Sequence, residues 1–595
     1  MPLELGSTNI SDLYFGSLPI EKVYKGTEIV YQKLLPRGYT LCEYLESTGT
    51  QYMNLGFKPS TGISAKAKLT APALGVVTAC ALGSMTSSSN RFDLLTFGRN
   101  VDQVFGLGYV QYNYLQPYTP KQTYELYAGL ENGNQWLDVD GVRMYTGTVS
   151  GNISSNYNML LFARYQYGNL NSIYTGKIWY VQIYQNGVLY MNLIPCLDAN
   201  YRPCMYDTVS KQPFYNQGTG EFDYKVVKYP IPANYTLCEY LESTGTQYIN
   251  TGYYSKSNSV YDMVIGDKSS VDTNAAGTIF GSSFGPALRY LTTGELRGGY
   301  NTGSWQSNSV TILDRNVIHM PSSTAFYNAT QLTLGSGSNT NYKLAMFANF
   351  SDQGGTGIGG YGKVKIYRFK IYTGSTCERY FVPCLDSNYV PCMYDLVSKQ
   401  TYYNSGTGDF MYKAISYKIP KNYTLCEYLE APTGATYIDL GFNATNSTDI
   451  EIRGQYLTSG TGHFYGYAQL LQIPNNGHVD FRYNGVTYAT SAQYNDIHTY
   501  RAKGRECYVD GTLVNTFNTA TFESPYTLTL FTVRQTDGSA GVGGGSRLYY
   551  TIIRENGTVT KYLVPCLDAV GTPCMYDLVT RTHFYNVGSG SFNYG

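Results

Sequence analysis

The chain has 595 residues, and its 42 Lys and Arg balance 42 Asp and Glu, so the formal net charge is zero. Charged residues make up 14% of the sequence, against about 25% in an ordinary globular protein. A neutral chain lacks the basic surface that nucleic acid or an anionic membrane attracts, which argues against both partners. Apolar runs such as residues 159–163 are too short to span a bilayer, so no membrane insertion is predicted.

The first segment, residues 1–35, differs in sequence from the rest of the chain. It holds three short β-rich runs separated at Gly16-Ser17 and Gly26-Thr27, which predicts a small meander with tight turns. So few residues cannot bury enough apolar area to fold alone. We therefore expect this segment to complete its fold against a partner or against copies of itself. No basic stretch followed by an apolar run is present here, so no secretory signal peptide is predicted.

One sequence then occurs three times. The motif Tyr-Thr-Leu-Cys-Glu-Tyr-Leu-Glu opens each copy, and Pro-Cys-Leu-Asp, followed closely by Pro-Cys-Met-Tyr-Asp, closes it. The opening motifs begin at Tyr39, Tyr235 and Tyr423. Copies spaced this far apart are whole domains, because solenoid repeats are much shorter. We predict three modules after the N-terminal segment, called here the first, second and third, at residues 36–229, 230–418 and 419–595.

The pattern inside each module is that of β-strands. Residues 176–184 alternate between two faces, with Trp179 expected on the buried one. In the matching run 365–372, Arg368 and Lys370 are expected to face water. Helical periodicity is not sustained anywhere, and β-branched and aromatic residues dominate between Gly, Asn and Ser turns. The prediction is an all-β fold in which each module is a two-sheet sandwich.

Prolines mark the joints between modules, at residues 228–232 and 417–420. Such joints are short and stiff, which predicts a rod of three modules.

The twelve cysteines fall four to a module. Two in each closing motif are spaced Cys-x7-Cys and could be cross-strand partners on a hairpin. Buried free thiols are favoured, a hairpin disulfide is the alternative, and zinc is least favoured because no further Cys or His repeats beside them. The spaced pairs are Cys196/Cys204, Cys384/Cys392 and Cys566/Cys574.

The opening and closing motifs resemble those of concanavalin A-like, laminin-G-like jelly-roll domains in surface proteins of bacteriophages and gut bacteria. The Asp-Gly turns in residues 138–144 and 508–514 resemble a short hairpin of that family, and 313–318 is the expected counterpart in the second module, without the glycine. The resemblance covers residues 36–595 and implies three tandem lectin-like jelly rolls. Separately, the pattern Leu-Tyr-x-Gly-Ser and Val-Tyr-x-Gly in residues 1–35 resembles short modules that begin structural proteins of tailed-phage virions.

The candidate ligand-binding residues lie where the three modules differ. Before the strand at 176–184, each module carries a loop of its own sequence, which is typical of one scaffold with separate specificities. In the first module, Tyr165 and Tyr167 are suited to stack on sugar faces, while Arg164 and Asn169 are suited to bond hydroxyls. The alternative is an exposed loop that binds nothing.

Catalysis, a cofactor and a metal are not predicted. Residues 355–360 fit G-x-G-x-x-G, but a nucleotide site needs a helix to follow and here a strand pattern follows. The repeated carboxylates Glu43 and Glu46 invite a glycosidase interpretation, yet the Glu-x-Asp-x-x-Glu signature of catalytic jelly-roll glycosidases is absent, and cross-strand pairing or exposure to solvent is favoured. None of the five His residues repeats across the modules, so no triad or metal site is built three times.

These features predict a non-enzymatic structural and adhesion protein of the phage virion surface, assembled in the host cytoplasm. We expect residues 1–35 to bind other virion proteins, the modules to bind host-surface glycan, and the chain to form a homotrimer, as thin virion appendages commonly do. The alternatives are a purely structural decoration or adaptor protein, a bacterial surface adhesin and a glycan hydrolase.

Overall fold

The computed structural model describes the chain except for a set of short segments. These are residues 1–3, 6–7, 10–12, 16–17, 21, 26–27, 33–34, 37, 74–78, 88–89, 98–103, 109–111, 132, 150–153, 269–276, 284, 292, 301–304, 322, 338–340, 416, 418, 421, 433–434, 459–461, 468–470, 476–477 and 519–520. The described residues form strands β1 to β61 and no helix, which confirms the all-β prediction. A helix long and apolar enough to cross a membrane is therefore not found in the described ranges.

In the N-terminal segment the strands pair two by two, β1 with β2, β3 with β4 and β5 with β6. The first predicted run therefore pairs with the second and the second with the third, as a meander requires, while residue 21, between β4 and β5, lies outside the described residues. The predicted turns at Gly16-Ser17 and Gly26-Thr27 lie outside the described residues. The strands are β1 (Glu4–Leu5), β2 (Thr8–Asn9), β3 (Leu13–Phe15), β4 (Leu18–Ile20), β5 (Lys22–Lys25) and β6 (Glu28–Gln32).

The first module consists of a 10-stranded and an 8-stranded sheet. In sheet order, with side pairings last, the larger sheet contains β16 (Val142–Thr148), β15 (Asn134–Val139), β14 (Thr123–Glu131), β9 (Ile63–Thr70), β20 (Gly176–Gln185), β7 (Thr40–Ser47), β21 (Val188–Leu197), β22 (Pro203–Asp207), β23 (Gln212–Tyr215) and β24 (Asp223–Val226). The smaller contains β13 (Tyr112–Pro117), β12 (Val104–Gly108), β11 (Asn90–Phe97), β10 (Ala79–Ser87), β17 (Leu160–Leu161), β8 (Met53–Asn54), β18 (Arg164–Gln166) and β19 (Asn169–Asn171).

The second module has a 10-stranded sheet, a 6-stranded sheet and a separate two-stranded pair. The larger sheet contains β34 (Thr330–Thr333), β33 (Thr324–Tyr327), β32 (Asn316–Met320), β27 (Ser259–Lys268), β38 (Val364–Thr373), β25 (Thr236–Glu242), β39 (Thr376–Leu385), β40 (Pro391–Asp395), β41 (Gln400–Tyr403) and β42 (Met411–Ala414). The smaller contains β26 (Ile249–Tyr254), β35 (Lys343–Met346), β28 (Gly277–Gly281), β29 (Ala287–Tyr290), β30 (Leu296–Gly299) and β31 (Gln306–Asn308), and the pair is β36 (Ala348–Phe350) with β37 (Ile358–Tyr361).

The third module consists of an 11-stranded and an 8-stranded sheet. The larger contains β53 (Thr512–Thr516), β52 (Glu506–Val509), β51 (His498–Lys503), β46 (Asp449–Tyr456), β57 (Ser546–Glu555), β58 (Thr558–Leu567), β59 (Pro573–Asp577), β60 (His583–Phe584), β43 (Thr424–Leu425), β44 (Leu429–Ala431) and β61 (Asn593–Tyr594). The smaller contains β45 (Ile438–Thr445), β54 (Glu523–Leu530), β47 (Gly462–Tyr467), β48 (Leu471–Asn475), β49 (His478–Tyr483), β50 (Val486–Gln493), β55 (Thr532–Arg534) and β56 (Ala540–Gly543).

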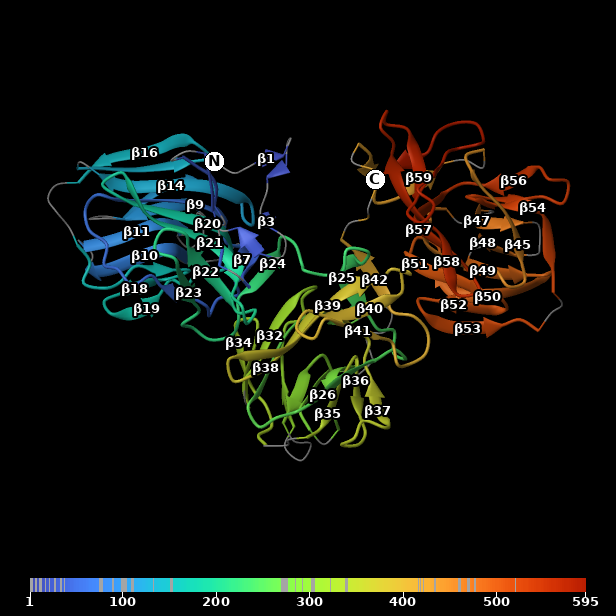
Figure 1. The fold of residues 1–595 in the computed structure, drawn as a ribbon, viewed down its shortest axis with the longest axis horizontal. Coiled ribbons are helices and arrows are strands. Elements are labelled where there is room, and N and C mark those ends of the chain that lie inside the picture. Colours follow the sequence, from blue (N-terminus) through green and yellow to red (C-terminus); the bar gives the residue numbers. More distant parts are fainter. Residues whose placement is uncertain are drawn as a thin grey trace.

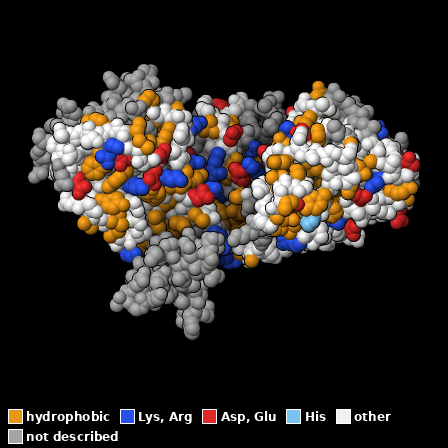
Figure 2. Space-filling model, turned by 90° about the horizontal axis from the view of Figure 1, so that it is seen from above, with side chains coloured by type: hydrophobic (Ala, Val, Ile, Leu, Met, Phe, Trp, Pro, Cys, Tyr) orange, Lys and Arg blue, Asp and Glu red, His pale blue; other side chains and the backbone are white. Residues whose placement is uncertain are grey.

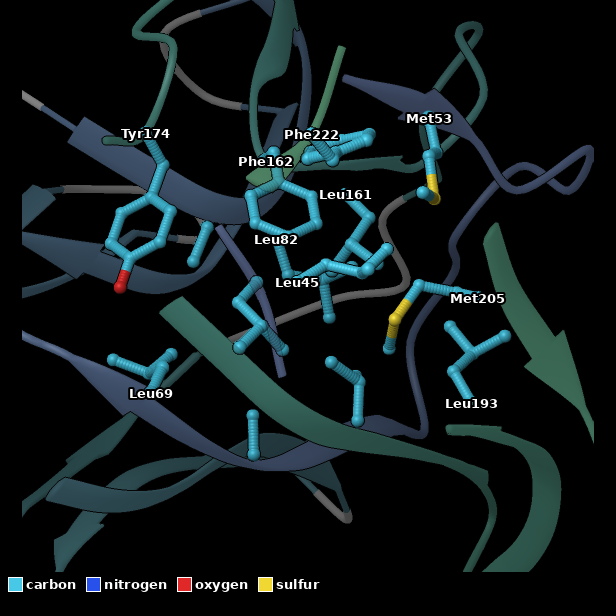
Figure 3. Close-up of a cluster of buried hydrophobic side chains, with 14 of the residues drawn as sticks. Leu45, Met53, Leu69, Leu82, Leu161, Phe162, Tyr174, Leu193, Met205 and Phe222 are labelled. Carbon is cyan, nitrogen blue, oxygen red and sulfur yellow. The ribbon is translucent and has the colours of Figure 1, made fainter. Parts of the chain in front are cut away.

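Each module is a two-sheet sandwich whose core lies between the sheets. In the first module, Leu45 and Leu69 of the larger sheet face Leu82 and Leu161 of the smaller one, and all four are fully buried (Figure 3). Alternate residues of the strands supply this core, as the period of a β-strand requires. The prediction of three tandem jelly-roll sandwiches is confirmed. Each pair of sheets comes from one copy of the repeat, while the exact limits of the modules stay a prediction.

The repeated motifs have structural roles. In the opening motif, the fully buried Gln51 accepts a hydrogen bond at Oε1 from the Thr48 backbone N–H at 2.8 Å, and Gln247 repeats this bond with Thr244 at 2.8 Å. The cysteines of each closing motif are directly opposite each other across strands, and all twelve cysteines are buried free thiols, as predicted.

Two local predictions are wrong. Trp179 lies outside the core because a register shift between Ile178 and Tyr180 turns its side chain outward, where it packs against Tyr44. The hairpin of the second module turns at Asn328, in αL conformation between β33 and β34, and not at residues 313–318. Asn328 accepts a bond from a backbone N–H of the neighbouring strand at 2.8 Å, as the aspartates of the Asp-Gly turns do.

The modules are not arranged as a straight rod. The second module lies below and between the other two, so the chain bends at both joints (Figure 1). At each joint, the end of one module packs onto the outer face of the next module's larger sheet. Seen from above, Lys and Arg side chains gather with Asp and Glu in the middle of the molecule, between the outer modules (Figure 2).

A cluster of four tyrosines recurs at each joint. In the first joint, the hydroxyls of Tyr224 and Tyr229 lie 2.8 and 3.2 Å from that of Tyr380 in the second module. Tyr201 packs edge-on against the same ring and donates to the Leu396 carbonyl at 3.1 Å. The second joint repeats every one of these contacts, with Tyr412, Tyr417, Tyr389 and Tyr562 in the corresponding places.

The outer ends of the array lack this cluster. In the first module, Asn192 is the residue equivalent to Tyr380 and Tyr562, the tyrosines that contact the preceding module. The equivalence follows because the backbone N–H of each of the three donates to the aspartate that ends its closing motif. Gly571 occupies in the third module the place of Tyr201 and Tyr389, at the same turn. The tyrosine joint is therefore specific to the two internal contacts.

Candidate ligand-binding site

The four predicted site residues lie together on the β18–β19 hairpin, but they do not form one surface. Arg164 is buried, and its guanidinium bonds Asp93 at 2.6 Å and Gln166 at 2.8 Å. The bond to Asp93 ties the hairpin to β11, and the bond to Gln166 stays within β18, so this side chain has a structural role and is not directed to a ligand.

The other three predicted residues are more open. Tyr167 is 53% exposed and adopts a positive φ at the hairpin turn, and Asn169 is exposed beside it. Tyr165 is half-buried against Tyr157, at a ring-centroid distance of 6.0 Å. One exposed ring and one amide at a hairpin tip form no enclosed pocket, so the binding role of this hairpin stays a prediction.

A better-formed cavity lies at the first joint, with a volume of about 350 Å³. Apolar walls come from both modules, including Phe222 and Tyr215 from the first and Val260 and Tyr372 from the second. The lining also includes Glu221, Asp262 and His319, which lie together at one end, and Arg202. An apolar cavity of this size with a few polar groups is the usual form of a small-ligand site.

The polar end is built by strand register. His319 of β32, Asp262 of β27 and Lys370 of β38 are cross-strand neighbours, so their side chains form a row on the outer face of the second module's larger sheet. The closing segment of the first module then places Glu221 over this row, with Oε1 2.5 Å from the Lys370 Nζ. The site therefore exists only when the two modules are docked.

Lys370 was expected to face water, and this expectation is wrong. Its side chain is fully buried under the preceding module, where it also bonds the Tyr201 carbonyl at 3.3 Å and lies within 5.7 Å of three tyrosine ring centroids. Arg368 is likewise 3% exposed and pairs with Asp223 of the first module at 2.7 Å. Strand alternation places both residues correctly on the outer face, but another module covers that face instead of solvent.

The electrostatics of the cluster follow from burial and proximity. Burial, together with the nearby Asp262 carboxylate, raises the pKa of Glu221 to about 8, although Lys370 opposes the shift. Burial alone would raise the pKa of Asp262, but His319, at 2.5 Å from Nδ1 to Oδ1, outweighs it and lowers this pKa to about 2. Burial would lower the pKa of His319, but the Asp262 carboxylate raises it overall.

A metal is disfavoured by the donors themselves. Ligand atoms of Glu221, Asp262 and His319 lie within 4.8 Å of one another, which is compatible with a cation. The Lys370 ammonium, however, already occupies the position from which a cation would neutralise Glu221, and His319 bonds Asp262 directly. A divalent ion would have to displace or repel a buried ammonium.

Glycoside hydrolysis is disfavoured by the same geometry. Oxygen atoms of the Glu221 and Asp262 carboxyls lie within 4.8 Å of each other, and each carboxyl shifts the pKa of the other. A glycosidase holds its two carboxyls about 5 Å or more apart to admit the scissile bond. The cluster is therefore suited to hold a polar ligand by hydrogen bonds, and it lacks the gap that hydrolysis needs.

The second joint has a counterpart of this cavity, but it is almost filled, with about 20 Å³ left. Register places Arg501 where the first joint has His319, and Glu451 where it has Asp262. Arg554 bonds this Glu451 at 2.9 Å and occupies the place of Tyr372. Two long guanidinium side chains thus take the space that remains open in the first joint.

Comparisons with known proteins add little to this assignment. No protein-family model matches the chain, and no curated protein matches it. Similar solved structures include domains LG4–5 of the mouse laminin α1 chain, with 10% identity over 57% of this chain and 92% of that one and a TM-score of 0.24. A pentraxin from Limulus polyphemus has 10% identity, coverages of 24% and 74% and a TM-score of 0.19. The NanB sialidase of Streptococcus pneumoniae has 9% identity, coverages of 90% and 91% and a TM-score of 0.19. Scores this low carry no argument, so the sandwich assignment rests on the sheets themselves.

The cluster at the first joint was missed in the sequence because its members are not repeated. His319 has no counterpart at the same position of the other modules, and Glu221 and Asp262 belong to no recognisable motif. The one available signal was the unusual pair of charges in the strand at residues 365–372. Charges at that position indicate a partner carboxylate whenever the strand face is covered.

Proposed function

We propose that this chain is a non-enzymatic adhesion protein that binds carbohydrate on the surface of a bacterial host as part of a bacteriophage particle. The observation that carries the proposal is the cavity at the first joint. It combines tyrosine rings, which stack on sugar faces, with a row of charged groups able to bond hydroxyls. Its size is suited to a single sugar residue with its substituents.

The arrangement of the modules supports an adhesive role. The tyrosine clusters and the buried ion pairs hold three sandwiches in a defined order, so a ligand bound at one joint is carried on a stiff array. Several copies of such an array on one particle would convert weak single-site binding into avidity. A homotrimer would provide those copies.

The particle assignment rests on sequence motifs. The resemblance of residues 1–35 to the opening modules of tailed-phage virion proteins supports attachment of this segment to other virion proteins. The same resemblance supports a location on the virion surface.

The proposal is tested by binding of the full chain to a glycan array and to host cells, beside a His319→Arg variant and a Tyr167→Ala variant. The arginine should fill the joint cavity as Arg501 does in the second joint. We expect saturable, sugar-competed binding that falls at least tenfold in His319→Arg and persists in Tyr167→Ala. Loss of binding in Tyr167→Ala alone would indicate that the ligand binds at the β18–β19 hairpin and not at the joint cavity. Absence of binding by the folded wild-type chain would refute the carbohydrate function.

A second candidate function is a purely structural decoration protein. The second joint favours it, because the same framework there forms a nearly solid contact without a usable cavity. In that case the first cavity would be a packing difference, and co-purification with virion proteins would occur without any glycan binding.

A further inference from the structure

Two arginines stand side by side on the outer face of the second module's smaller sheet. Arg289 of β29 and Arg297 of β30 are directly opposite each other across the strands. Their neighbours in sequence, Leu288 and Leu296, are fully buried, so the arginines point away from the core. Directly opposed residues on antiparallel strands have Cβ atoms about 5 Å apart.

Within the described part of the chain, neither guanidinium has a carboxylate partner. The Nε atoms of both are buried and make no hydrogen bond. Burial lowers the pKa of Arg289, and the neighbouring Arg297 lowers it further, with no acidic group acting against them. Elsewhere in the chain, half-buried or buried arginines such as Arg368 and Arg547 are paired with acids. Like charges opposed in this way destabilise a sheet, so the pair calls for a counter-charge that the described part of the chain does not supply.

An indole ring stands beside the two arginines. The Arg289 guanidinium lies over the Trp305 ring at 5.0 Å from its centroid. The ring rests where β30 has Gly299, since a Cβ at that residue would lie 2.9 Å from Trp305 Cδ1. Ser307, exposed on β31, is the next residue of the row beyond Arg297 and supplies a hydroxyl. Two planar cations, one half-buried indole and one hydroxyl therefore share one surface.

From this arrangement we infer a second binding site, which takes an anionic saccharide, namely a pyranose that bears a carboxylate. The paired guanidiniums present forked donors that match a carboxylate in bidentate geometry, and the indole matches the apolar face of a sugar ring. The inference rests on the proposed carbohydrate binding but not on the cavity at the first joint. It names the class of sugar that this face selects.

The third module provides a matched comparison. By register, Pro474 and Asp480 take the places of Arg289 and Arg297 in the third module. The pair beside them on the same face is Gln472 with Arg482, so a single guanidinium stands there instead of two. His463 bonds the amide of Gln472 at 3.1 Å and so occupies it internally. The anionic site is therefore expected once in the chain.

The test is calorimetric titration of the full chain with trigalacturonic acid, and with its fully methyl-esterified form as the neutral match. Three variants are compared with wild type: Arg297→Gln, Trp305→Ala, and Arg482→Gln as the control in the third module. We expect the acid to bind and the ester to bind at least tenfold more weakly. Arg297→Gln should lose the acid, Trp305→Ala should weaken it, and Arg482→Gln should leave it unchanged.

Thermal unfolding gives a readout that does not depend on measurable affinity. Removing one of two opposed charges should raise the melting temperature of Arg297→Gln without ligand. Added trigalacturonate should raise the melting temperature of wild type and of Arg482→Gln but not that of Arg297→Gln. Equal binding of acid and ester, or binding unaffected by Arg297→Gln, would overturn the inference. If inorganic sulfate raises the melting temperature as much as trigalacturonate does, the site binds anions without selecting a sugar. That result would overturn the inference that the ligand is a saccharide. His319→Arg should not change trigalacturonate binding here, which separates this site from the joint cavity.

Discussion

The two joints of the array are built on one framework and completed with different side chains. Each buries four tyrosines in the same contacts, so docking of one module onto the next depends on these shared aromatic and hydroxyl groups. The charged groups around them are not shared. The first joint combines Lys370 with Glu221 and leaves a cavity, whereas the second uses Arg501 and Arg554 and is nearly solid. The tyrosines thus define the interface, and the charged side chains determine how much space each joint leaves.

The largest expected difference between the joints is in their buried charges. Asp223 is 3% exposed and neutralises Arg368, with Arg315 bonded to it at 2.8 Å. Asp223→Ala leaves these cations unpaired in the joint and should cost about 3–5 kcal/mol, since that is the usual effect of breaking a buried pair. Scanning calorimetry of the full chain should show an earlier transition, and X-ray scattering should show an opened first joint.

In the second joint Met411 takes the place of Asp223, so the comparison uses the acid that forms an ion pair across this joint, with the change Asp409→Ala. This residue corresponds to Glu221, but its side chain is 48% exposed, so its pair with Arg501 is screened by water. We expect less than about 1 kcal/mol. Equal effects of Asp223→Ala and Asp409→Ala would contradict the expectation that water screens the Asp409–Arg501 pair more than the Asp223–Arg368 pair.

The shared part of the joints is tested by Tyr380→Phe and Tyr562→Phe. Each removes a buried hydroxyl that bonds two others and leaves those two short of a partner. Each change should cost about 1–3 kcal/mol, and the two costs should agree, because the contacts are the same. Chemical denaturation monitored by tyrosine fluorescence measures both. A marked difference would show that the charges and not the tyrosines carry the docking energy.

Exchanging the residues that fill the space should exchange the cavities. Arg501→His shortens a side chain at the second joint and should open a cavity there, while His319→Arg should close the first. We expect sugar binding to fall at least tenfold in His319→Arg, about 1.4 kcal/mol. Folding should be retained in both variants, as judged by the melting temperature. A His319→Arg protein that binds sugar normally would place the ligand elsewhere.

The smallest expected effect is a pH dependence of the first joint. The pKa values of Glu221, at about 8, and of His319 are both raised in the folded chain. Groups of this kind stabilise the folded state below their ordinary pKa values, and the contribution is lost as pH rises through the folded ones. The first joint should therefore weaken between about pH 5 and 8, by on the order of 1 kcal/mol.

Melting curves across this range would show the pH effect, and Glu221→Gln should flatten it. The pKa of Asp262 is lowered to about 2, so this group stabilises the folded state at higher pH, and its contribution is lost only in strong acid. Stability that rises between pH 5 and 8 would contradict the assigned protonation of Glu221.

The sequence predicted the sandwiches well because their signals are local and repeated. Alternating apolar residues and the recurring motifs were enough to indicate strands, sheets and the number of copies. The same alternation could not predict the burial of Lys370 and Arg368, since a strand pattern distinguishes two faces but not solvent from a neighbouring module. Trp179 was misplaced by a single register shift, which no local pattern marks.

The candidate site was beyond sequence reasoning for a related reason. Its residues come from the end of one module and from three strands of the next, so they become neighbours only through docking. Repetition was a good guide to what holds the array together. It was a poor guide to binding, because the joint-specific residues are those that differ between copies.

The distribution of the joint tyrosines also sets how such a protein can change in length. Among the three modules, the second alone has the tyrosines for both contacts. Tyr380 contacts the first module, and Tyr389, Tyr412 and Tyr417 contact the third. The first module has Asn192 at the position of Tyr380, and the third has Gly571 at the position of Tyr389. Gene duplication of the middle module would therefore insert a copy that fits both neighbours, whereas duplication of either outer module would create a junction that lacks part of the tyrosine cluster. Lineages that carry arrays of four or five modules should have gained them in the middle.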